Sequence, residues 1–301
     1  MNTKNKINTL KSQLENGVSP AMATPLQADG YRINEGVVPH LVNFLLDKGV
    51  KGLFIGGTTG EGLVLALEER MRLHEAAMTA VNHRIPVLLH VGANDMQTAV
   101  ALTQHAVQLQ PDALVAIPPT FFGIDDAALA NYFQTIAAAA PGIPLLLYDI
   151  PHMAINGISP ALFARLKQEL PTLAGVKTSR PDAQIIRQHI DVAAGDLLVL
   201  AGNERIALGS LAMGADGLIS GLSTAVPEPF VALTQAIGNG DLAAARQAHQ
   251  TINRLLDMMP VRRIGGIKQI LAERGIPVGT AVPPRPMPTE PIWPQMQPLL
   301  P

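Results

Sequence analysis

Eight short apolar segments recur along the chain, and longer segments with helically spaced apolar residues separate them. Each short segment is rich in Val, Ile and Leu and is flanked by Gly or Pro, which is typical of buried parallel strands. Parallel strands need long connections, usually helical, so this repeat points to an α/β fold. The eight predicted strands are Val18–Leu26, Gly52–Gly57, Pro86–Gly92, Ala113–Pro119, Pro144–Pro151, Leu173–Ser179, Leu197–Gly202 and Gly217–Gly221.

The segments between these strands carry helix signals. Asp95 and Asp125 can cap helices that end near Gln108 and Ala140, and Ser159 is an N-cap followed by proline at the first helical position. Eight strand–helix pairs in succession predict an α/β protein with a (βα)8 TIM barrel. The other predicted helices are Asn34–Lys48, Leu67–Val81, Asp182–Ala193, Arg205–Met213 and Val226–Ile237.

A doubly wound open sheet is the alternative, because the same alternation serves both folds. Its nucleotide-binding fingerprint is missing. Gly238, Gly240 and Ala243 match it loosely, but they lie between two predicted helices with no strand before them. Gly57 and Gly62 have the spacing of a phosphate-binding loop, but Leu-Val follows where Lys-Ser or Lys-Thr is required.

Two regions are expected along the chain. Residues 1–237 form the barrel, preceded by a short polar N-terminal segment. Residues 238–301 form a C-terminal helical extension that packs on the barrel, with helices at Asp241–Met259 and Arg262–Arg274. From Pro283 the chain is proline-rich, which predicts an extended tail on the surface or on the extra helices.

Composition excludes several classes of protein. With 22 basic and 24 acidic residues the net charge is −2, so no electrostatic footprint for nucleic acid or anionic lipid exists. Cysteine is absent, which removes disulfides, thiolate nucleophiles and cysteine-bound metal sites. No apolar run approaches the ~18 residues of a membrane helix, and residues 1–17 lack the apolar region of a secretory signal. We expect a soluble, cytoplasmic protein.

One lysine has an unusual place. Of the eight lysines, only Lys177 lies inside an apolar strand segment. Catalytic groups of a (βα)8 barrel come from the C-terminal ends of its strands, where Lys177 is expected. Burial disfavours the ammonium form and lowers its pKa, which converts a lysine into a nucleophile at neutral pH. Pairing with a carboxylate is the alternative role.

Two further features belong to the same end of the predicted barrel. Tyr148, one of three tyrosines, ends the fifth strand, so its phenol can meet Lys177 and transfer protons. Thr58 and Thr59, within Gly56–Glu61 after the second strand, offer hydroxyl and backbone donors to a carboxylate. Taken together, a lysine, a phenol and a carboxylate-binding loop favour catalysis over separate structural roles.

Other candidates are weaker. His74-Glu75 begins a zinc-protease motif, but Met78 stands where its second histidine is required. His90, in the third strand, is more typical of a buried core histidine than of a metal ligand. We therefore expect no metal site.

Several motifs resemble the dihydrodipicolinate synthase / N-acetylneuraminate lyase family. They are Gly57–Glu61 (Gly-Thr-Thr-Gly-Glu), Tyr148–Pro151 (Tyr-Asp-Ile-Pro) and Gly175–Ser179 (Gly-Val-Lys-Thr-Ser), in this order. Gly214–Gly221 is similar to the eighth-strand segment of the family. The resemblance covers essentially the whole chain, including the helical extension.

The resemblance implies a pyruvate-dependent class I aldolase barrel that needs no metal and no dissociable cofactor. Lys177 is expected to form a Schiff base with pyruvate or another 2-keto acid, and Tyr148 to transfer protons. Thr59 is expected to be catalytic as well, on a proton path to Tyr148. The expected substrate-binding residues are Thr58, Thr59, Gly202, Glu204, Ile219 and Ser220.

The sequence departs from the family at positions that select the aldehyde partner. Dihydrodipicolinate synthases have an arginine closely after the segment that matches Tyr148–Pro151, and it grips the carboxylate of the aldehyde. Here His152-Met153-Ala154 follows, with no arginine, and if Met153 occupies that place the pocket lacks this carboxylate-binding group. Phe121 replaces a tyrosine that joins a neighbouring subunit's site. Gly202–Arg205 reads Gly-Asn-Glu-Arg where sialic acid lyases have Gly-Tyr-Asp-Glu, although Glu204 or Arg205 can still bind a polyol or an acid.

The sequence thus predicts a lyase or aldolase that acts on pyruvate or a 2-keto acid together with an aldehyde, and a keto-deoxy sugar acid is the favoured substrate. Dihydrodipicolinate synthesis from pyruvate and aspartate semialdehyde is the alternative within the family. A catalytically silent barrel that binds a keto acid is the alternative outside catalysis. Phe121 and Phe122, adjacent aromatics on the fourth-strand loop, predict a homo-oligomer, which the family suggests is a tetramer.

Overall fold

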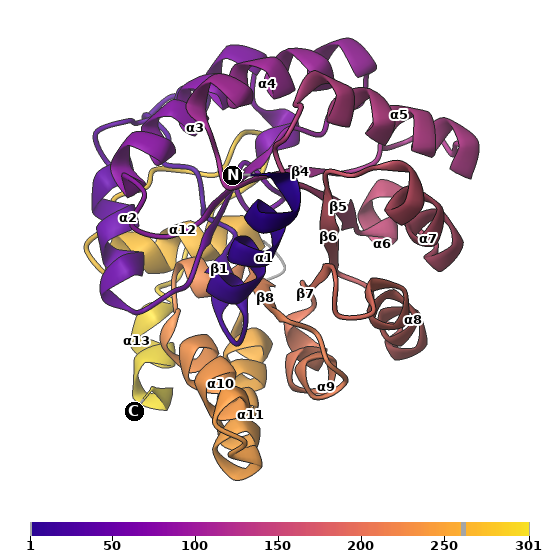
Figure 1. Cartoon of the computed structure of the whole chain (residues 1–301). Coiled ribbons are helices and arrows are strands. Elements are labelled where there is room, and N and C mark those ends of the chain that lie inside the picture. The colour runs from indigo at the N-terminus through magenta and orange to yellow at the C-terminus, as the bar shows by residue number, and fades with distance from the viewer. Residues whose placement is uncertain (1, 260–262, 301) are drawn as a thin grey trace.

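The strands of the computed structural model form one parallel sheet that curves into a barrel (Figure 1). They pair in the order β1-β8-β7-β6-β5-β4-β3-β2, and a bridge between Ala21 and Phe54 joins β1 to β2. The predicted (βα)8 barrel is confirmed. The structure describes residues 2–259 and 263–300, in which the strands are β1 (Val18–Pro20), β2 (Leu53–Ile55), β3 (Val87–His90), β4 (Ala113–Ala116), β5 (Leu145–Asp149), β6 (Leu173–Thr178), β7 (Leu198–Ala201) and β8 (Gly217–Ser220).

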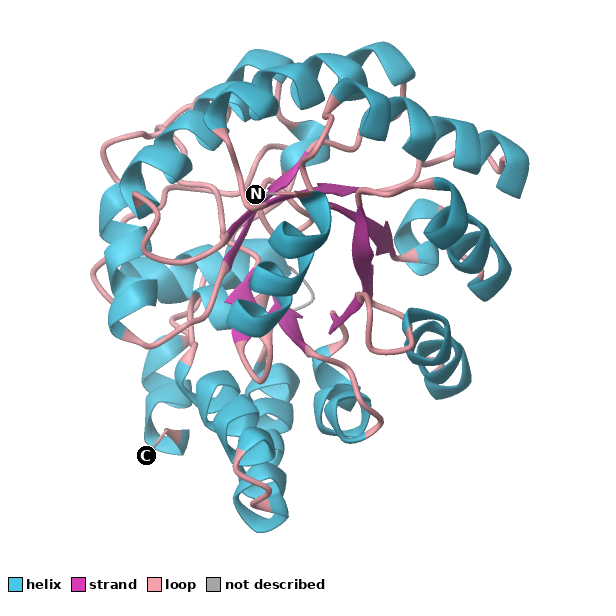
Figure 2. Cartoon of the chain, in the orientation of Figure 1, coloured by secondary structure: helices cyan, strands magenta, loops and turns pink. Residues whose placement is uncertain are grey.

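Helices surround the strands, as Figure 2 shows. Asp95, Asp125 and Ser159 accept a hydrogen bond from the first turn of the helix that each precedes, as predicted. The helix predicted from Asn34 begins later, at Val38, so that Pro39 lies in its first turn, where a missing amide hydrogen costs nothing. The helices of the barrel are α2 (Val38–Asp47), α3 (Leu67–Val81), α4 (Met96–Leu109), α5 (Asp126–Ala139), α6 (Pro151–Ala154), α7 (Pro160–Glu169), α8 (Ala183–Ala193), α9 (Ala207–Ala212) and α10 (Glu228–Gly238).

Each strand is shorter than its predicted segment. The apolar runs continue into the buried first residues of the loops, as at Ala21–Ala23 after β1. Short 3-10 turns occupy some of these loops: η1 (Gly62–Val64) follows β2, η2 (Glu204–Ile206) follows β7 and η3 (Leu222–Thr224) follows β8. The helix predicted over Arg205–Met213 is therefore split between η2 and α9.

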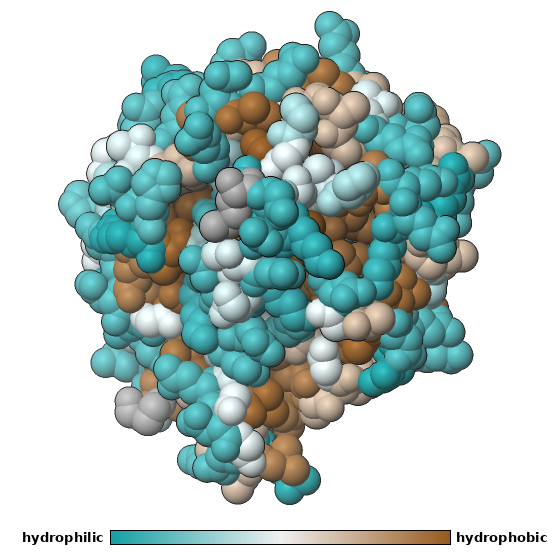
Figure 3. All heavy atoms as spheres, in the orientation of Figure 1, coloured by the Kyte–Doolittle hydropathy of each residue, from teal (hydrophilic) through white to brown (hydrophobic). Residues whose placement is uncertain are grey.

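An additional helix, α1 (Thr3–Leu14), closes the amino-terminal end of the barrel. Ile7, Leu10 and Leu14 are buried and join the cluster inside the barrel, while the surface over α1 is largely hydrophilic (Figure 3). Sequence alone indicated only a polar segment here. The helix α1 thus covers the interior of the barrel at one end.

A β-bulge in β6 determines which way Lys177 points. Leu145 pairs with Leu173 but Leu146 pairs with Gly175, so Ala174 is an extra residue in β6. Side chains alternate between the two faces of a regular strand, and one extra residue reverses the faces beyond it. Ala174 accordingly belongs to the inner cluster and Val176 to the outer one, which turns Lys177 inward.

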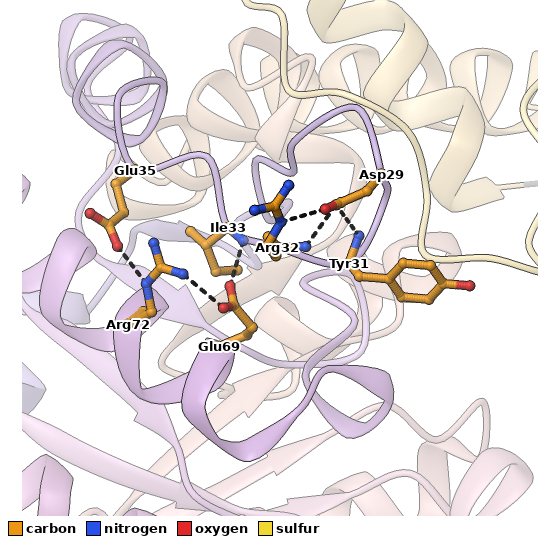
Figure 4. Close-up of polar contacts among 7 residues, drawn as sticks. All are labelled: Asp29, Tyr31, Arg32, Ile33, Glu35, Glu69 and Arg72. Carbon is orange, nitrogen blue, oxygen red and sulfur yellow. Dashed lines mark hydrogen bonds and ion pairs between the residues drawn. The ribbon is translucent and has the colours of Figure 1, made fainter.

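The connection between β1 and α2 folds back as a small hairpin, shown in Figure 4. The Asp29 carboxylate accepts hydrogen bonds from the backbone amide of Tyr31 and from Arg32. Glu69 accepts from the backbone amide of Ile33, and it also pairs with Arg72 of the same helix, α3. The hairpin is thereby fixed to α3.

The C-terminal extension consists of α11 (Leu242–Met258), α12 (Arg263–Glu273), α13 (Trp293–Met296) and the short turn η4 (Gln297–Leu299). The start predicted for α12, Arg262, lies outside the described residues. The tail that was expected to be extended instead ends in α13 and η4. Val278 lies between α12 and α13, and its carbonyl accepts a hydrogen bond from the Leu26 amide at 3.0 Å. This contact joins the tail to the hairpin after β1. In the described part of the chain, no helix is both long and apolar enough to cross a membrane.

Candidate active site

A cavity of about 320 Å³ opens at the carboxyl ends of the strands. It brings together predicted site residues from five loops and strands: Thr58, Thr59, Tyr148, Lys177, Gly202, Glu204 and Ile219 line it. A larger groove of about 500 Å³ lies at the opposite end beside α1, but its lining includes none of the predicted site residues. We therefore take the smaller cavity as the candidate active site.

Lys177 lies at the base of this cavity with only 3% of its surface exposed. Its Nζ atom is 3.8 Å from the centre of the Tyr148 ring and 4.4 Å from the centre of the Phe54 ring. Burial lowers the pKa of the Lys177 ammonium below its usual value, and the neighbouring Tyr148 opposes part of that shift. Lys177 therefore holds more of the free amine, the nucleophilic form, than an exposed lysine does.

Tyr148 stands beside Lys177 because the register of β5 and β6 pairs the two residues directly. Its hydroxyl lies 3.0 Å from the Thr58 Oγ1, within hydrogen-bond distance. Phe54 and His90 meet the Tyr148 ring edge-on, with ring centres 5.8 Å and 6.2 Å away. Packed between rings and tethered at its hydroxyl, the phenol is held at a defined place next to the lysine amine.

His90 takes part in this packing as a neutral side chain. It is buried, and burial lowers its pKa well below the usual histidine value. Arg70, also buried, donates to the His90 carbonyl at 3.0 Å and lies 3.1 Å from His90 Nδ1. His90 thus packs against the Tyr148 ring as a buried residue, as expected for a core histidine.

The loop after β2 presents the two threonines. The resemblance places Thr59 on a proton path to Tyr148, but in the structure the hydroxyl that contacts Tyr148 belongs to Thr58. The Thr59 hydroxyl lies instead beside Gly221 after β8, where an added Cβ atom would be 2.6 Å from the Thr59 Oγ1. The two neighbouring threonines therefore face different walls of the same cavity.

Glycine at position 202 makes room for the lysine. A Cβ atom there would lie 3.1 Å from Lys177 Cε and 2.3 Å from Ser179 Oγ. Ile219 lines the cavity from the neighbouring strand β8. These two residues shape the space above the amine rather than contribute reactive groups.

Ser220, which the sequence predicts to bind substrate, is not among the residues that line the cavity. Because Ile219 points into the barrel, the alternation of the strand turns Ser220 outward. Ser220 is buried, and its hydroxyl donates to the Glu204 Oε1 at 2.7 Å. Ser220 therefore supports Glu204 from outside the barrel.

Glu204 lines the cavity with a carboxylate that already has several partners. Besides Ser220, the Leu222 amide donates to its Oε1 at 2.8 Å, and Arg263 pairs with its Oε2. Arg263 belongs to α12 and lines the cavity together with Ile264 and Ile267. Sequence did not identify these three residues, because their spacing is that of any amphipathic helix.

The arginines near the cavity are engaged by carboxylates. Arg180 Nε donates to the buried Asp149 at 2.6 Å, and Asp149 also accepts from Thr178 at 3.0 Å. Arg205 Nη1 pairs with Asp257 at 2.6 Å. Met153, which follows β5, lines the cavity and is exposed.

Phe121 and Phe122 lie outside the cavity. They are 75% and 72% exposed, and their rings meet edge-on with centres 4.9 Å apart. Phe121 has a φ of 79°, in the left-handed region that few side chains adopt without support. Within the described residues, no cluster of three or more His, Asp or Glu side chains is arranged to hold a metal ion.

Comparisons with known proteins agree on one family. The model of the dihydrodipicolinate synthetase family matches residues 14–297. A 4-hydroxy-tetrahydrodipicolinate synthase of Salinibacter ruber is 35% identical over 233 residues, which cover 77% of this chain and 76% of that protein. YagE of Escherichia coli, a putative 2-dehydro-3-deoxy-D-gluconate aldolase, is 31% identical over 296 residues, which cover 96% of this chain and 97% of that protein.

Solved structures show the same relationship. A catalytic-lysine mutant of the sialic acid aldolase of Ruminococcus gnavus has a TM-score of 0.90 and 27% identity, and covers 96% of this chain and 95% of its own. The crystal structure of YagE in complex with pyruvate has a TM-score of 0.87 and 30% identity, and covers 94% of this chain and 96% of its own.

Proposed function

The chain belongs to the dihydrodipicolinate synthetase family, and from that membership we propose that it is a lyase which makes or breaks a carbon–carbon bond of a 2-keto acid through an imine on Lys177. The observation that carries this proposal is the set of three groups at the base of the cavity. A buried amine lies against the Tyr148 ring, and the Tyr148 hydroxyl lies 3.0 Å from that of Thr58.

Imine formation begins when the Lys177 amine adds to the keto carbon of the substrate. The carbonyl oxygen takes up a proton, and loss of water from the resulting carbinolamine leaves a protonated imine. The Tyr148 hydroxyl, held by Thr58, is the group that gives and takes these protons. The positive charge of the imine at C2 can then accept the electron pair of the C3–C4 bond when that bond breaks.

In the cleavage direction, Tyr148 removes the proton of the hydroxyl on C4. The C3–C4 bond breaks, its electron pair moves into the imine, and an aldehyde leaves. The remaining enamine takes a proton at C3, and water hydrolyses the imine to release pyruvate and the free lysine. Synthesis is the same sequence in reverse, so these residues serve both directions.

The carboxylate of the keto acid is bound in this proposal by the loop after β2. Thr58 and Thr59 face the cavity there, and their hydroxyl and amide groups are hydrogen-bond donors. A carboxylate held at this loop turns the keto carbon towards Lys177. Such fixed orientation replaces a chance encounter and accounts for a large part of the rate in reactions of this kind.

The aldehyde half of the substrate is proposed to carry hydroxyl groups, as in a keto-deoxy sugar acid. The three arginines near this part of the cavity, Arg180, Arg205 and Arg263, are each paired with a carboxylate. A second carboxylate on the substrate would need one of these pairs to break. Hydroxyl groups of the substrate can instead form hydrogen bonds with the arginine N–H groups and the carboxylate oxygens while these ion pairs stay intact. YagE, which is similar over its whole length, is a putative aldolase of such a sugar acid.

Dihydrodipicolinate synthesis is the second candidate, because several relatives carry that name, including the synthase of Salinibacter ruber. Its aldehyde, aspartate semialdehyde, bears a carboxylate, and Met153 cannot bind one. The discriminating experiment measures pyruvate release from a panel of keto-deoxy sugar acids beside condensation of pyruvate with aspartate semialdehyde. Efficient condensation with aspartate semialdehyde would show that the preference for a hydroxylated partner is wrong. Inactivity with every substrate would favour a barrel that only binds a keto acid.

The protein is further proposed to be a homo-oligomer, with a tetramer as the expected form. Phe121, Phe122 and Ile124 after β4 and Met153 and Ile155 after β5 are all exposed apolar side chains. Aromatic residues that protrude from a loop are typical anchors of protein interfaces. Contact with another subunit would bury them.

A further inference from the structure

A buried ion pair links the C-terminal extension to the loop that holds the two threonines. The Lys268 Nζ of α12 lies 2.9 Å from the Glu61 Oε2, and both side chains are 0% exposed. Glu61 closes the Gly-Thr-Thr-Gly-Glu motif, and no step of the proposed reaction uses it. Neither residue lines the cavity, so neither touches the substrate.

Glu61 is an integral part of the loop. Its backbone has a φ of 59°, and its amide donates to the Thr58 carbonyl at 3.1 Å. The turn is tight, since a Cβ atom on Gly62 would lie 1.9 Å from the Gly56 carbonyl oxygen. Any movement of the Glu61 side chain is therefore transmitted to Thr58 and Thr59 through only two or three residues of compact backbone.

Within the described residues, the polar partners of the Glu61 carboxylate, in contrast to those of its backbone, belong to the C-terminal extension. Lys268 also donates to the Thr280 carbonyl at 2.7 Å, and the Val282 amide donates to the Glu61 Oε1 at 2.8 Å. Arg285 lies 3.7 Å from the same oxygen. The carboxylate is thus held by α12 and by the segment after it, rather than by the barrel.

We propose that the Glu61–Lys268 pair is a positioning device that fixes the threonine loop in the orientation which binds the carboxylate of the keto acid. Replacing a buried ion pair with apolar residues is often neutral or even stabilising, so stability alone is a poor reason for this one. Together with the hydrogen bond from the Val282 amide to the Glu61 Oε1, the ion pair joins the substrate loop to a separate part of the chain. Lys268 and Glu61 are positioning residues, because they act through Thr58 and Thr59.

This inference rests on the proposed function, and a trapping experiment separates the two. Borohydride reduces an imine to a stable adduct, so the pyruvate concentration that gives half-maximal adduct on Lys177 reports binding. Acetone forms an imine as well but has no carboxylate for the loop to bind. The test compares Lys268→Met with Arg274→Met. Arg274 also belongs to the extension, but it pairs at 2.6 Å with the Oε1 of Glu228 in α10 of the barrel, away from the threonine loop.

We expect Lys268→Met to raise the half-maximal pyruvate concentration about tenfold or more, because small displacements of positioning groups are costly. The adduct yield with acetone should stay within about twofold of wild type, since the amine itself is undisturbed. Arg274→Met should leave both readouts close to wild type. A shift that is equal in the two variants, or equal for pyruvate and acetone, would overturn the inference.

Lys268→Met leaves the Glu61 carboxylate buried without its main partner and can fail to fold for that reason. The double variant Glu61→Gln/Lys268→Met removes both charges and is the second protein to test. It should fold and show the same selective loss of pyruvate affinity, and normal pyruvate affinity in the folded double variant would equally overturn the inference. If wild-type protein gives no adduct with pyruvate, the proposed function fails instead.

Discussion

Tyr148 and Lys177 stand directly opposite each other on neighbouring parallel strands, and the Lys177 amine lies 3.8 Å from the centre of the Tyr148 ring. This relationship depends on the extra residue Ala174 in β6, which turns Lys177 into the barrel. The proposed nucleophile and its proposed proton-transfer partner are therefore brought together by the register of β5 and β6.

Loss of the Tyr148 hydroxyl should slow turnover while Lys177 stays in place. In Tyr148→Phe the ring still packs against Lys177, but the proton carrier and its hydrogen bond to Thr58 are gone. We expect kcat to fall by about 10²–10⁴-fold, the usual contribution of a positioned acid–base group. The measurement is pyruvate release from the best keto-acid substrate. A decrease of less than about tenfold would assign proton transfer to another group.

Gly175 should be irreplaceable in the bulge. Its φ of 151° is unfavourable for other residues, and an added Cβ would lie 2.0 Å from the Leu198 carbonyl oxygen. Gly175→Ala should therefore lower the free energy of unfolding by about 1–3 kcal/mol or more, and it should reduce imine trapping. Gly209→Ala is the control, because nothing lies near that position in α9, and it should stabilise the protein by about 0.5–1 kcal/mol. Equal behaviour of the two variants in chemical denaturation would contradict this account of the bulge.

Burial of Lys177 should appear in the pH dependence of stability. The pKa of its ammonium is lower in the folded protein than in the unfolded chain, so the unfolded chain binds more protons between those two values. The free energy of unfolding contributed by this group therefore rises with pH in that window and is lowest below it. We expect Lys177→Met to be more stable than wild type at pH 7, by a margin that shrinks as the pH approaches the ~10.4 of an ordinary lysine. The pKa of Lys268 is also lowered, but Lys268 is present in both the wild type and Lys177→Met, so its contribution cancels in the comparison. A margin that grows with pH would contradict the assignment.

The exposed aromatic pair should be buried between subunits. We expect wild-type protein to sediment as an oligomer, most simply a tetramer, and Phe121→Ser/Phe122→Ser to dissociate into smaller species because it removes the anchors. Sedimentation velocity at micromolar concentration measures both. A wild-type species near the 31.9 kDa of one chain would refute the oligomer.

Much of the fold followed from the sequence because hydrophobic periodicity and caps are local signals. Lys177 was identifiable because it is the one lysine in an apolar strand segment, and the outward direction of Ser220 could have been predicted from its neighbour Ile219. The choice between Thr58 and Thr59 could not be predicted, because it depends on a tight loop conformation. The roles of α1 and α12 were also missed, since a few apolar residues on a polar helix do not indicate which surface that helix covers.

The most direct test of the central claim is reduction of the protein with borohydride in the presence of pyruvate, followed by peptide mass analysis. We predict a single stable adduct, seen as a mass increase on the peptide that contains Lys177, and loss of both adduct and turnover in Lys177→Ala. An adduct on a different lysine, or undiminished activity of Lys177→Ala, would contradict the account.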